Sequence, residues 1–226
     1  MPTPPPTPSS VASAAKPKKS RSPMATAIEL VVIVAIAVGL AYLIQAFIVK
    51  PYKIPSGSME PTLEIGQRVL VDRIGESLGD PSVGSIVVFH PPGGAGDGGG
   101  EGSSECGSPD YKRGYEACPK PNSKPSETNF IKRIVAGPGD TLSIVDGQPI
   151  VNGKKKSEPY IKPCAVPSEE ACNFPHPIKI PPGHWFMMGD NRGESDDSRF
   201  WGPVPTSWII GEAFATYWPP SRIGSL

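Results

Sequence analysis

Two side chains in the sequence are of types that can serve as a nucleophile and a base. One is a serine in residues 54–63, IPSGSMEPTL, and the other is a lysine in residues 129–142, NFIKRIVAGPGDTL. A serine hydroxyl attacks a carbonyl only after a base removes its proton. A lysine amine can act as that base only when neutral, and its ordinary pKa is about 10.4. Desolvation lowers the pKa of an amine, so such a lysine must be buried.

The sequence around Lys132 predicts this burial. The run is typical of a strand, and alternate side chains of a strand share a face. Phe130 and Ile134 therefore flank Lys132 on one face. Arg133 falls on the other face, from which it could help neutralise Asp197. The pattern favours a desolvated amine over a solvated surface lysine.

The serine segment could present hydroxyl and backbone donors to a substrate. If the segment is extended, Ser56 and Ser58 point to one side and Gly57 points away. A glycine at this point lets a substrate approach the backbone closely. Losing one oxyanion donor typically costs about 3–4 kcal/mol of transition-state stabilisation.

A third segment, residues 187–205, reads MMGDNRGESDDSRFWGPVP. Taken alone, each of the three segments reads as a turn, a strand or a loop. A Ser-His-Asp triad is disfavoured, because none of the histidines lies in a motif with Ser58; they are His90, His176 and His184. Paired-carboxylate catalysis is also disfavoured, because turn and ion-pair duties explain the acids of GESDDSR.

Together and in this order, the three segments resemble the bacterial type I signal peptidases, which are membrane-anchored serine proteases with a Ser–Lys dyad. The shared motifs are Ser-Gly-Ser-Met-x-Pro-Thr-Leu, the Lys-Arg strand that runs into Gly-Pro-Gly-Asp, and Gly-Asp-Asn-Arg…Ser…Asp-Ser-Arg…Trp-Gly. The resemblance covers the apolar segment before residue 50 and most of residues 50–226. It is lost in the N-terminal tail and in a glycine-rich insertion.

The resemblance implies a role for each matching residue. Ser58 matches the nucleophile and Lys132 the general base. Ser56 matches a serine whose hydroxyl joins the Ser58 N–H in the oxyanion hole, and Ser195 matches a serine that orients the lysine amine. The matching support network consists of Asp197, Arg199 and Arg133.

The implied reaction is cleavage of exported preproteins after small residues at positions −1 and −3. Ile54, Pro55 and Met59 are expected to contribute to substrate binding, although Met59 fits the core equally well. No cofactor, metal or nucleic acid is expected. The 22 basic and 22 acidic residues balance, so no overall positive field exists to collect phosphates.

An uncharged run at residues 30–49 predicts a membrane anchor, assigned to residues 27–49. Twenty residues at roughly 1.5 Å each span a hydrocarbon core of about 30 Å. A buried soluble helix would show a polar stripe, and a cleaved signal peptide would end in a small-x-small site; neither is present. The preceding tail, residues 1–26, carries four basic and no acidic residues, which favours a cytoplasmic N-terminus and an extracytoplasmic catalytic domain in residues 50–226.

Ser58 follows the anchor by nine residues, so the chain can place it no more than roughly 30 Å from the membrane. A soluble substrate would not require this closeness. A substrate held in the same bilayer by its own apolar segment would require it. The expected partners are therefore secretory preproteins and the lipid bilayer.

The exported part is expected to be mainly β, a barrel-like or folded sheet with a smaller β extension at about 146–182. Thirty prolines argue against a helical bundle. Residues 91–128, rich in glycine and serine, read as a flexible insertion. Short runs of β-branched and aromatic residues predict the strands, at residues 68–72, 85–90, 129–136, 141–145, 184–188 and 208–218.

Four cysteines on the predicted exported side indicate disulfides. Proximity favours Cys106–Cys118 and Cys164–Cys172, although three connectivities exist. Zinc binding is disfavoured by the scattered histidines and the lack of a CxxC pair.

Other functions remain open at this point. One is an inactive membrane-anchored β domain that binds peptides or scaffolds an export complex, which the retention of Ser58, Lys132 and Ser195 argues against. Another is a self-cleaving repressor-type Ser–Lys protease, which the anchor and cysteines disfavour. An organellar inner-membrane peptidase is an alternative closer to the signal peptidase reading. The related endoplasmic-reticulum enzymes carry histidine in place of Lys132, which sets this chain apart from them.

Overall fold

In a computed structural model of the chain, the structure describes residues 23–73, 79, 81–93, 95, 116–120, 124–166 and 170–226. The chain divides between Tyr42 and Leu43 into two compact units. Most of the predicted cytoplasmic tail and most of the predicted insertion at 91–128 lie outside the described residues.

Helix α1 (Pro23–Phe47) begins at a proline, which suits the first position of a helix because its missing N–H has no partner there. Its part Pro23–Tyr42 is long and apolar enough to cross a membrane. The helix starts and ends earlier than the predicted segment 27–49. Val49 already belongs to strand β1 (Val49–Lys53), because Pro51 suits an edge strand and not a helix interior.

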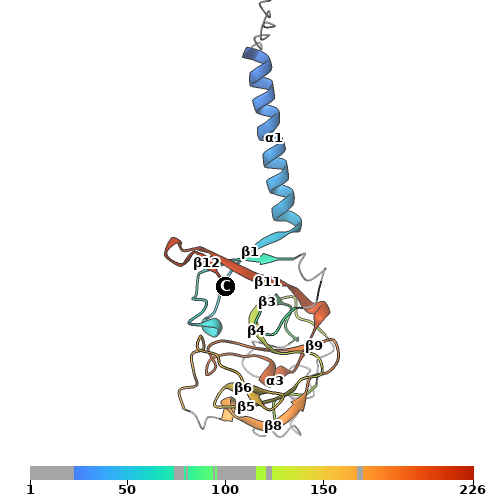
Figure 1. The fold of residues 1–226 in the computed structure, drawn as a ribbon, viewed down its shortest axis with the longest axis vertical. Helices are drawn as coiled ribbons and strands as arrows, with labels where there is room; N and C mark the ends of the chain where they lie inside the picture. The colour runs from blue at the N-terminus through green and yellow to red at the C-terminus, as the bar shows by residue number, and fades with distance from the viewer. Residues whose placement is uncertain are drawn as a thin grey trace, which may run out of the picture. The chain divides into compact units, whose positions relative to one another are not determined.

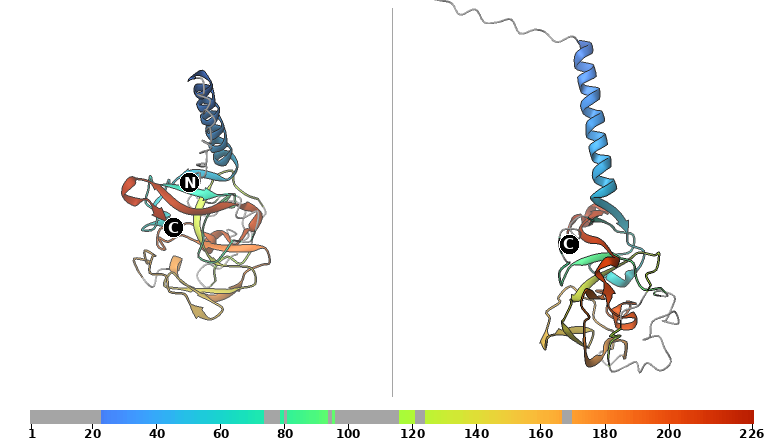
Figure 2. Two further views of the ribbon diagram at one scale, coloured as in Figure 1. Left: turned by 45° about the horizontal axis from the view of Figure 1, so that its top comes forward. Right: turned by 90° about the vertical axis from the view of Figure 1, so that its right-hand side faces the viewer.

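A large antiparallel sheet forms most of the second unit, in the order β1-β2-β11-β3-β4-β9-β10, with β12 paired to β11. Figure 2 shows that this sheet is curled rather than flat. The strands are β2 (Arg68–Asp72), β3 (Ile86–Phe89), β4 (Phe130–Ala136), β9 (His184–Met188), β10 (Val204–Pro205), β11 (Ile209–Trp218) and β12 (Gly224–Ser225).

A second sheet of four strands has the order β7-β6-β5-β8 and lies at the opposite end of this unit from β1 (Figure 1). Its strands are β5 (Thr141–Val145), β6 (Gln148–Val151), β7 (Lys154–Lys155) and β8 (Phe174–Lys179). The turn between β5 and β6 has positive φ at both Asp146 and Gly147, as a tight hairpin requires. This sheet starts at Thr141, before the predicted extension at 146–182. The predicted mainly β fold is confirmed.

Five short helical segments connect strands within the described residues. The four-residue α3 is capped by Asp197, whose carboxylate accepts from the N–H of Arg199. The sequence showed no helix after the membrane segment, because α3 is too short for an amphipathic pattern. The segments are η1 (Gly57–Met59), η3 (Glu170–Cys172), α3 (Ser198–Trp201), η4 (Thr206–Trp208) and η5 (Pro220–Arg222).

Three clusters of buried apolar side chains hold the second unit together. One lies around Val69, Ile86 and Met59, and another around Phe89, Ile134 and Trp185. The third lies around Leu142 and Phe186 and joins the small sheet to the large one. Strand β4 contributes to all three, through Ile131, Ile134 and Val135. The strand that carries Lys132 is therefore fixed from both sides.

The predicted disulfide between Cys164 and Cys172 is confirmed. Cys118 is also disulfide-bonded, but Cys106, its predicted partner, lies outside the described residues.

Candidate active site

Ser58 lies in the turn η1, which follows β1. Ser56 is extended, but Gly57–Met59 forms a 3-10 turn closed by a hydrogen bond from the Glu60 N–H to the Gly57 carbonyl at 3.1 Å. The predicted extended geometry is therefore wrong beyond Ser56. The two hydroxyls still lie close, because Ser56 Oγ donates to Ser58 Oγ at 3.5 Å. Gly57 does not have positive φ, and a Cβ there would lie 3.1 Å from the Glu60 carboxylate, the end of a flexible side chain.

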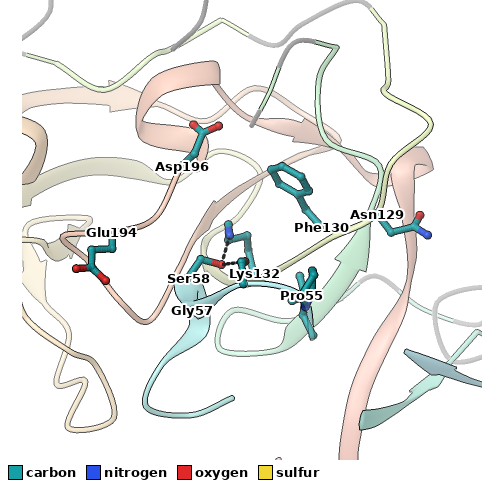
Figure 3. A pocket seen from close by; sticks show the side chains of 10 residues that line it. Pro55, Gly57, Ser58, Asn129, Phe130, Lys132, Glu194 and Asp196 are labelled. Atoms are coloured by element: carbon teal, nitrogen blue, oxygen red, sulfur yellow. Dashed lines mark hydrogen bonds between the residues drawn. The ribbon is translucent and has the colours of Figure 1, made fainter. Parts of the chain in front are cut away.

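Lys132 lies in the middle of β4 and reaches Ser58. Its Nζ donates to Ser58 Oγ at 2.6 Å, and only 4% of the lysine and 8% of the serine are exposed (Figure 3). The ring centre of Phe130 is 5.4 Å from the amine. Phe130 and Ile134 pack in one apolar cluster and Ile131 in another, which confirms the predicted faces of this strand.

Burial lowers the pKa of Lys132 from 10.5 to about 8. The negative charges of Asp197 and Asp196 oppose this shift, because they favour the ammonium form. The result is an amine that is partly neutral in mildly alkaline solution. Such an amine, hydrogen-bonded to a hydroxyl, can exchange a proton with it.

Asp197 and Arg199 form a fully buried ion pair behind the amine. Arg199 donates from Nε and Nη2 to the two carboxylate oxygens at 2.8 and 2.9 Å, and the Gly189 N–H donates to the same carboxylate at 3.0 Å. Burial acts to raise the pKa of Asp197, but the Arg199 guanidinium outweighs it and holds that pKa below its ordinary value. Arg199 also donates to the carbonyl of Ser195 at 3.1 Å.

Arg133 pairs with Asp190, and not with Asp197 as the sequence suggested. Its Nε and Nη2 donate to the Asp190 carboxylate at 2.9 and 2.7 Å. The reason is the strand register. Arg133 of β4 lies opposite Met188 of β9, so the residue two positions further along the chain comes beside it. The Tyr160 ring covers the guanidinium at 4.0 Å.

Ser195 is buried near the nucleophile turn but does not bind the amine. A Cβ built on Gly189 would lie 2.2 Å from Ser195 Oγ and 2.4 Å from the Ser58 carbonyl oxygen, so both atoms border that glycine. Among the described residues Ser195 Oγ has no hydrogen-bond partner. The predicted hydrogen bond to Lys132 is therefore missing from this structure, where the amine is bonded to Ser58 instead.

Asn191 is a site residue that the sequence reasoning missed. Its Nδ2 donates to the Gly57 carbonyl and its backbone N–H to the Ser58 carbonyl, both at 3.1 Å. These bonds fasten the nucleophile turn to the loop after β9. The motif Gly-Asp-Asn-Arg contained the residue, but no local pattern could identify a partner 134 positions away.

A pocket of about 410 Å³ opens onto Ser58 and Lys132. Pro55 lines it, as predicted for a substrate contact. Ile54 and Met59 do not, because they are 1% and 0% exposed and pack inward with Leu63 and Val69. The lining residues are Pro55, Ser56, Gly57, Ser58, Asn129, Phe130, Ile131, Lys132, Glu194 and Asp196. No group of three or more potential metal ligands occurs in the described part of the chain.

Known proteins are similar in sequence to this chain over most of its length. The model of the signal peptidase family, peptidase S26, matches residues 27–218. A probable signal peptidase I-2 of Synechocystis is 36% identical, over 83% of this chain and 71% of its own. A signal peptidase I of Leptolyngbya laminosa is 35% identical, over 84% of this chain and 78% of its own. A crystal structure of a signal peptidase I from Enterococcus faecalis is 22% identical with a TM-score of 0.35, over 59% of this chain and 97% of that one.

The chain therefore belongs to the signal peptidase family, peptidase S26. It is a hydrolase of the serine endopeptidase class, and the activity of this family is the removal of signal peptides.

Proposed function

We propose that the chain is a membrane-bound endopeptidase that removes N-terminal signal peptides from exported preproteins with a Ser58–Lys132 dyad. One observation carries the proposal: a buried amine with a pKa of about 8 makes a 2.6 Å hydrogen bond to a serine hydroxyl at the floor of a pocket. A serine needs a base within this distance to become a nucleophile.

The reaction proceeds in two steps. In its neutral form Lys132 accepts the proton of Ser58, and the Ser58 oxygen attacks the carbonyl carbon of the scissile bond. The resulting ammonium gives the proton to the leaving amine, which releases the mature chain and leaves an acyl-enzyme. Lys132 then removes a proton from water, which hydrolyses the ester and frees the signal peptide.

The oxyanion that forms during attack is stabilised by the Ser58 N–H and the Ser56 hydroxyl. The first N–H groups of a helical turn have no partner within the turn, and Ser58 is the second residue of η1. The Ser56 hydroxyl lies 3.5 Å from Ser58 Oγ and can rotate to the new oxyanion. Asn191 fixes the turn that presents both donors.

The remaining polar residues support Lys132. The Asp197–Arg199 pair holds the loop that carries Ser195 and adds a negative charge that favours the ammonium intermediate. After acylation Lys132 loses its bond to the Ser58 hydroxyl, and the buried Ser195 hydroxyl then orients the amine. Arg133 keeps Asp190 and the adjoining Asn191 in place.

Cleavage follows small residues at positions −1 and −3. The walls of the pocket beside Ser58 include the apolar residues Pro55, Phe130 and Ile131, which suit apolar side chains of a substrate. Ile54 and Met59 contribute indirectly. They pack in the core and support the backbone of Pro55–Ser58.

Helix α1 anchors the chain in the cytoplasmic membrane with the N-terminus inside and the catalytic unit outside. The support is its length and apolar sequence, the basic tail before it and the disulfide after it. A preprotein held in the same bilayer by its signal peptide would meet Ser58 close to the membrane.

The dyad is tested with the full-length protein in detergent and a purified preprotein. We expect Ser58→Ala and Lys132→Met each to reduce cleavage at least about a thousandfold. The new N-terminus of the product, read by sequencing, should follow a small residue. Circular dichroism and thermal unfolding of both variants establish that they are folded. Processing at the wild-type rate by either folded variant would exclude the dyad, and would favour a different nucleophile.

A further inference from the structure

The two ends of the pocket differ in charge. In Figure 3 the Ser58–Lys132 pair lies between Glu194 and Asp196 on one side and Pro55 and Asn129 on the other. The second side, at Pro55 and Asn129, carries no charged side chain among those labelled in Figure 3. The first side carries two carboxylates, and both residues are exposed.

Glu194 is hydrogen-bonded to Asn191 at its end of the pocket. Asn191 Nδ2 donates to its Oε2 at 3.0 Å, and its own N–H donates to the Asn191 carbonyl at 3.1 Å. The same Asn191 binds the nucleophile turn, so the distance from this carboxylate to Ser58 is set by one side chain.

A cation already lies beside this carboxylate. The Lys162 amine is 3.7 Å from Glu194 Oε2 and 3.9 Å from Glu60 Oε2. Both distances are long for an ion pair, and the Lys162 side chain is 49% exposed. The ammonium is therefore loosely held and can leave when another cation arrives.

Asp196, the residue after Ser195, contributes the second carboxylate at this end of the pocket. It lines the pocket, and its charge acts on the Lys132 amine. Glu194 and Asp196 thus place two negative charges in the lining of the pocket that holds Ser58, and the Lys162 amine lies near Glu194.

We propose that Glu194 and Asp196 form a cation-binding end of the substrate pocket, which favours preproteins with a lysine or arginine among the first two residues after the cut. The inference rests on the proposed function, because that function places small uncharged residues before the cut. Those residues suit the uncharged end at Pro55. The chain after the scissile bond must then leave across the acidic end.

The expected preference is moderate, because both carboxylates are exposed. An exposed ion pair contributes up to about 1 kcal/mol, which corresponds to about a fivefold increase in kcat/KM. An acidic side chain in the same place would be repelled. We expect the wild-type kcat/KM to be about tenfold higher for a peptide with lysine at the second position after the cut than for the same peptide with glutamate there.

The test compares these two peptides on the full-length protein in detergent, with Glu194→Gln, Asp196→Asn and the double variant. The ratio of kcat/KM for the two peptides should fall about threefold in each single variant and approach one in the double variant. A ratio of two substrates on one enzyme is insensitive to the protonation of Lys132, which acts on both equally. The matched control is Asp146→Asn, an exposed carboxylate in the turn between β5 and β6 that does not line the pocket.

Salt provides a second readout. Raising NaCl to about 0.5 M should reduce the wild-type ratio and leave the double variant unchanged, since exposed charges are screened. Cleavage of both peptides at equal rates by the wild type, or an unchanged ratio in the double variant, contradicts this inference and leaves the dyad intact. Cleavage of neither peptide by the wild type contradicts the proposed function and the inference together.

Discussion

The burial of one amine sets both the activity and part of the stability of this protein. Lys132 is 4% exposed, lies in a strand with apolar clusters on both of its faces, and lines the pocket. Water would stabilise the ammonium, and its removal lowers the pKa to about 8. Four charges tune that value from nearby. Asp197, Asp196 and Asp190 raise it, and Arg199 lowers it.

The pH dependence of cleavage follows from this pKa. The base must be neutral, so kcat/KM for a peptide should rise with pH, reach half its maximum near pH 8 and fall about tenfold per unit below that. Asp196→Asn removes a charge that favours the ammonium, so its profile should shift to lower pH. Steady-state rates from pH 5 to 10 measure both profiles. A flat profile down to pH 5 would be incompatible with an amine base.

The same burial predicts that Lys132→Met stabilises the fold at neutral pH. The folded pKa of about 8 lies below the ordinary 10.5, so the folded state binds the proton more weakly than the unfolded state. This penalty is fully present below pH 8 and is relieved as the pH rises from 8 to 10.5. The variant should therefore gain about 2–3 kcal/mol at pH 7, after loss of the bond to Ser58, and less at pH 10.

Urea unfolding of the two proteins at pH 7 and pH 10 measures this difference. The exposed lysine of β8, in the variant Lys179→Met, serves as the control and should change little at either pH. Equal stability of wild type and Lys132→Met at pH 7 would mean that the amine is solvated in the folded protein.

Single residues of the site could be predicted from the sequence where the evidence was local. The alternation of Phe130, Lys132 and Ile134 predicted the face of the strand on which the amine lies, and strand β4 occurs as expected. The partner of Arg133 could not be predicted, because it depends on the register of β4 against β9. Two aspartates seven positions apart in one loop were both available, and only the three-dimensional pairing separates Asp190 from Asp197.

At the scale of elements, the loop between β9 and α3 joins the nucleophile turn to the base. Its first residue, Gly189, allows that close approach by having no side chain. A Cβ there would meet Ser195 Oγ at 2.2 Å and the Ser58 carbonyl oxygen at 2.4 Å. The second contact is with backbone, so no rotamer change can relieve it.

We therefore expect Gly189→Ala to reduce kcat at least about a hundredfold by moving the nucleophile turn away from Lys132, since a misplacement of about 1 Å has that effect. Single-turnover cleavage of a peptide measures the change. The matched control is Gly224→Ala in β12, where a Cβ meets nothing within 4 Å. Normal rates for both variants would show that the loop can move without disturbing the site.

Elements with a continuous β-branched or aromatic pattern were predictable, and those built around prolines were not. β2, β3, β4, β5, β9 and β11 all occur where such runs predicted them. β1, β6 and β8 each contain proline, which masked their strand character, and β1 was also hidden by the apolar run before it. The 3-10 turn at Ser58 was missed because Pro55 and Gly57 fit an extended segment equally well.

At the scale of the whole molecule, the chain consists of a helix long enough to span a bilayer and a β unit whose site begins a few residues later. The first strand, β1, pairs with β2 within the β unit, and the Arg73 N–H donates to the Ile48 carbonyl at 2.9 Å. Ile48 is thus hydrogen-bonded into this unit, which is divided from the first unit between Tyr42 and Leu43. We expect the membrane helix to serve the encounter with the substrate.

This separation predicts the behaviour of a variant that consists of residues 43–226. We expect it to cleave a short soluble peptide with kcat/KM within about twofold of the full chain, because the site is complete without α1. Processing of a preprotein inserted in lipid vesicles should fall about a hundredfold, because two molecules confined to one bilayer meet at a much higher effective concentration. An unrelated membrane-spanning helix fused before residue 43 should restore it. Equal losses on both substrates would instead assign α1 a role in the fold, and no loss on either would remove the bilayer from the encounter.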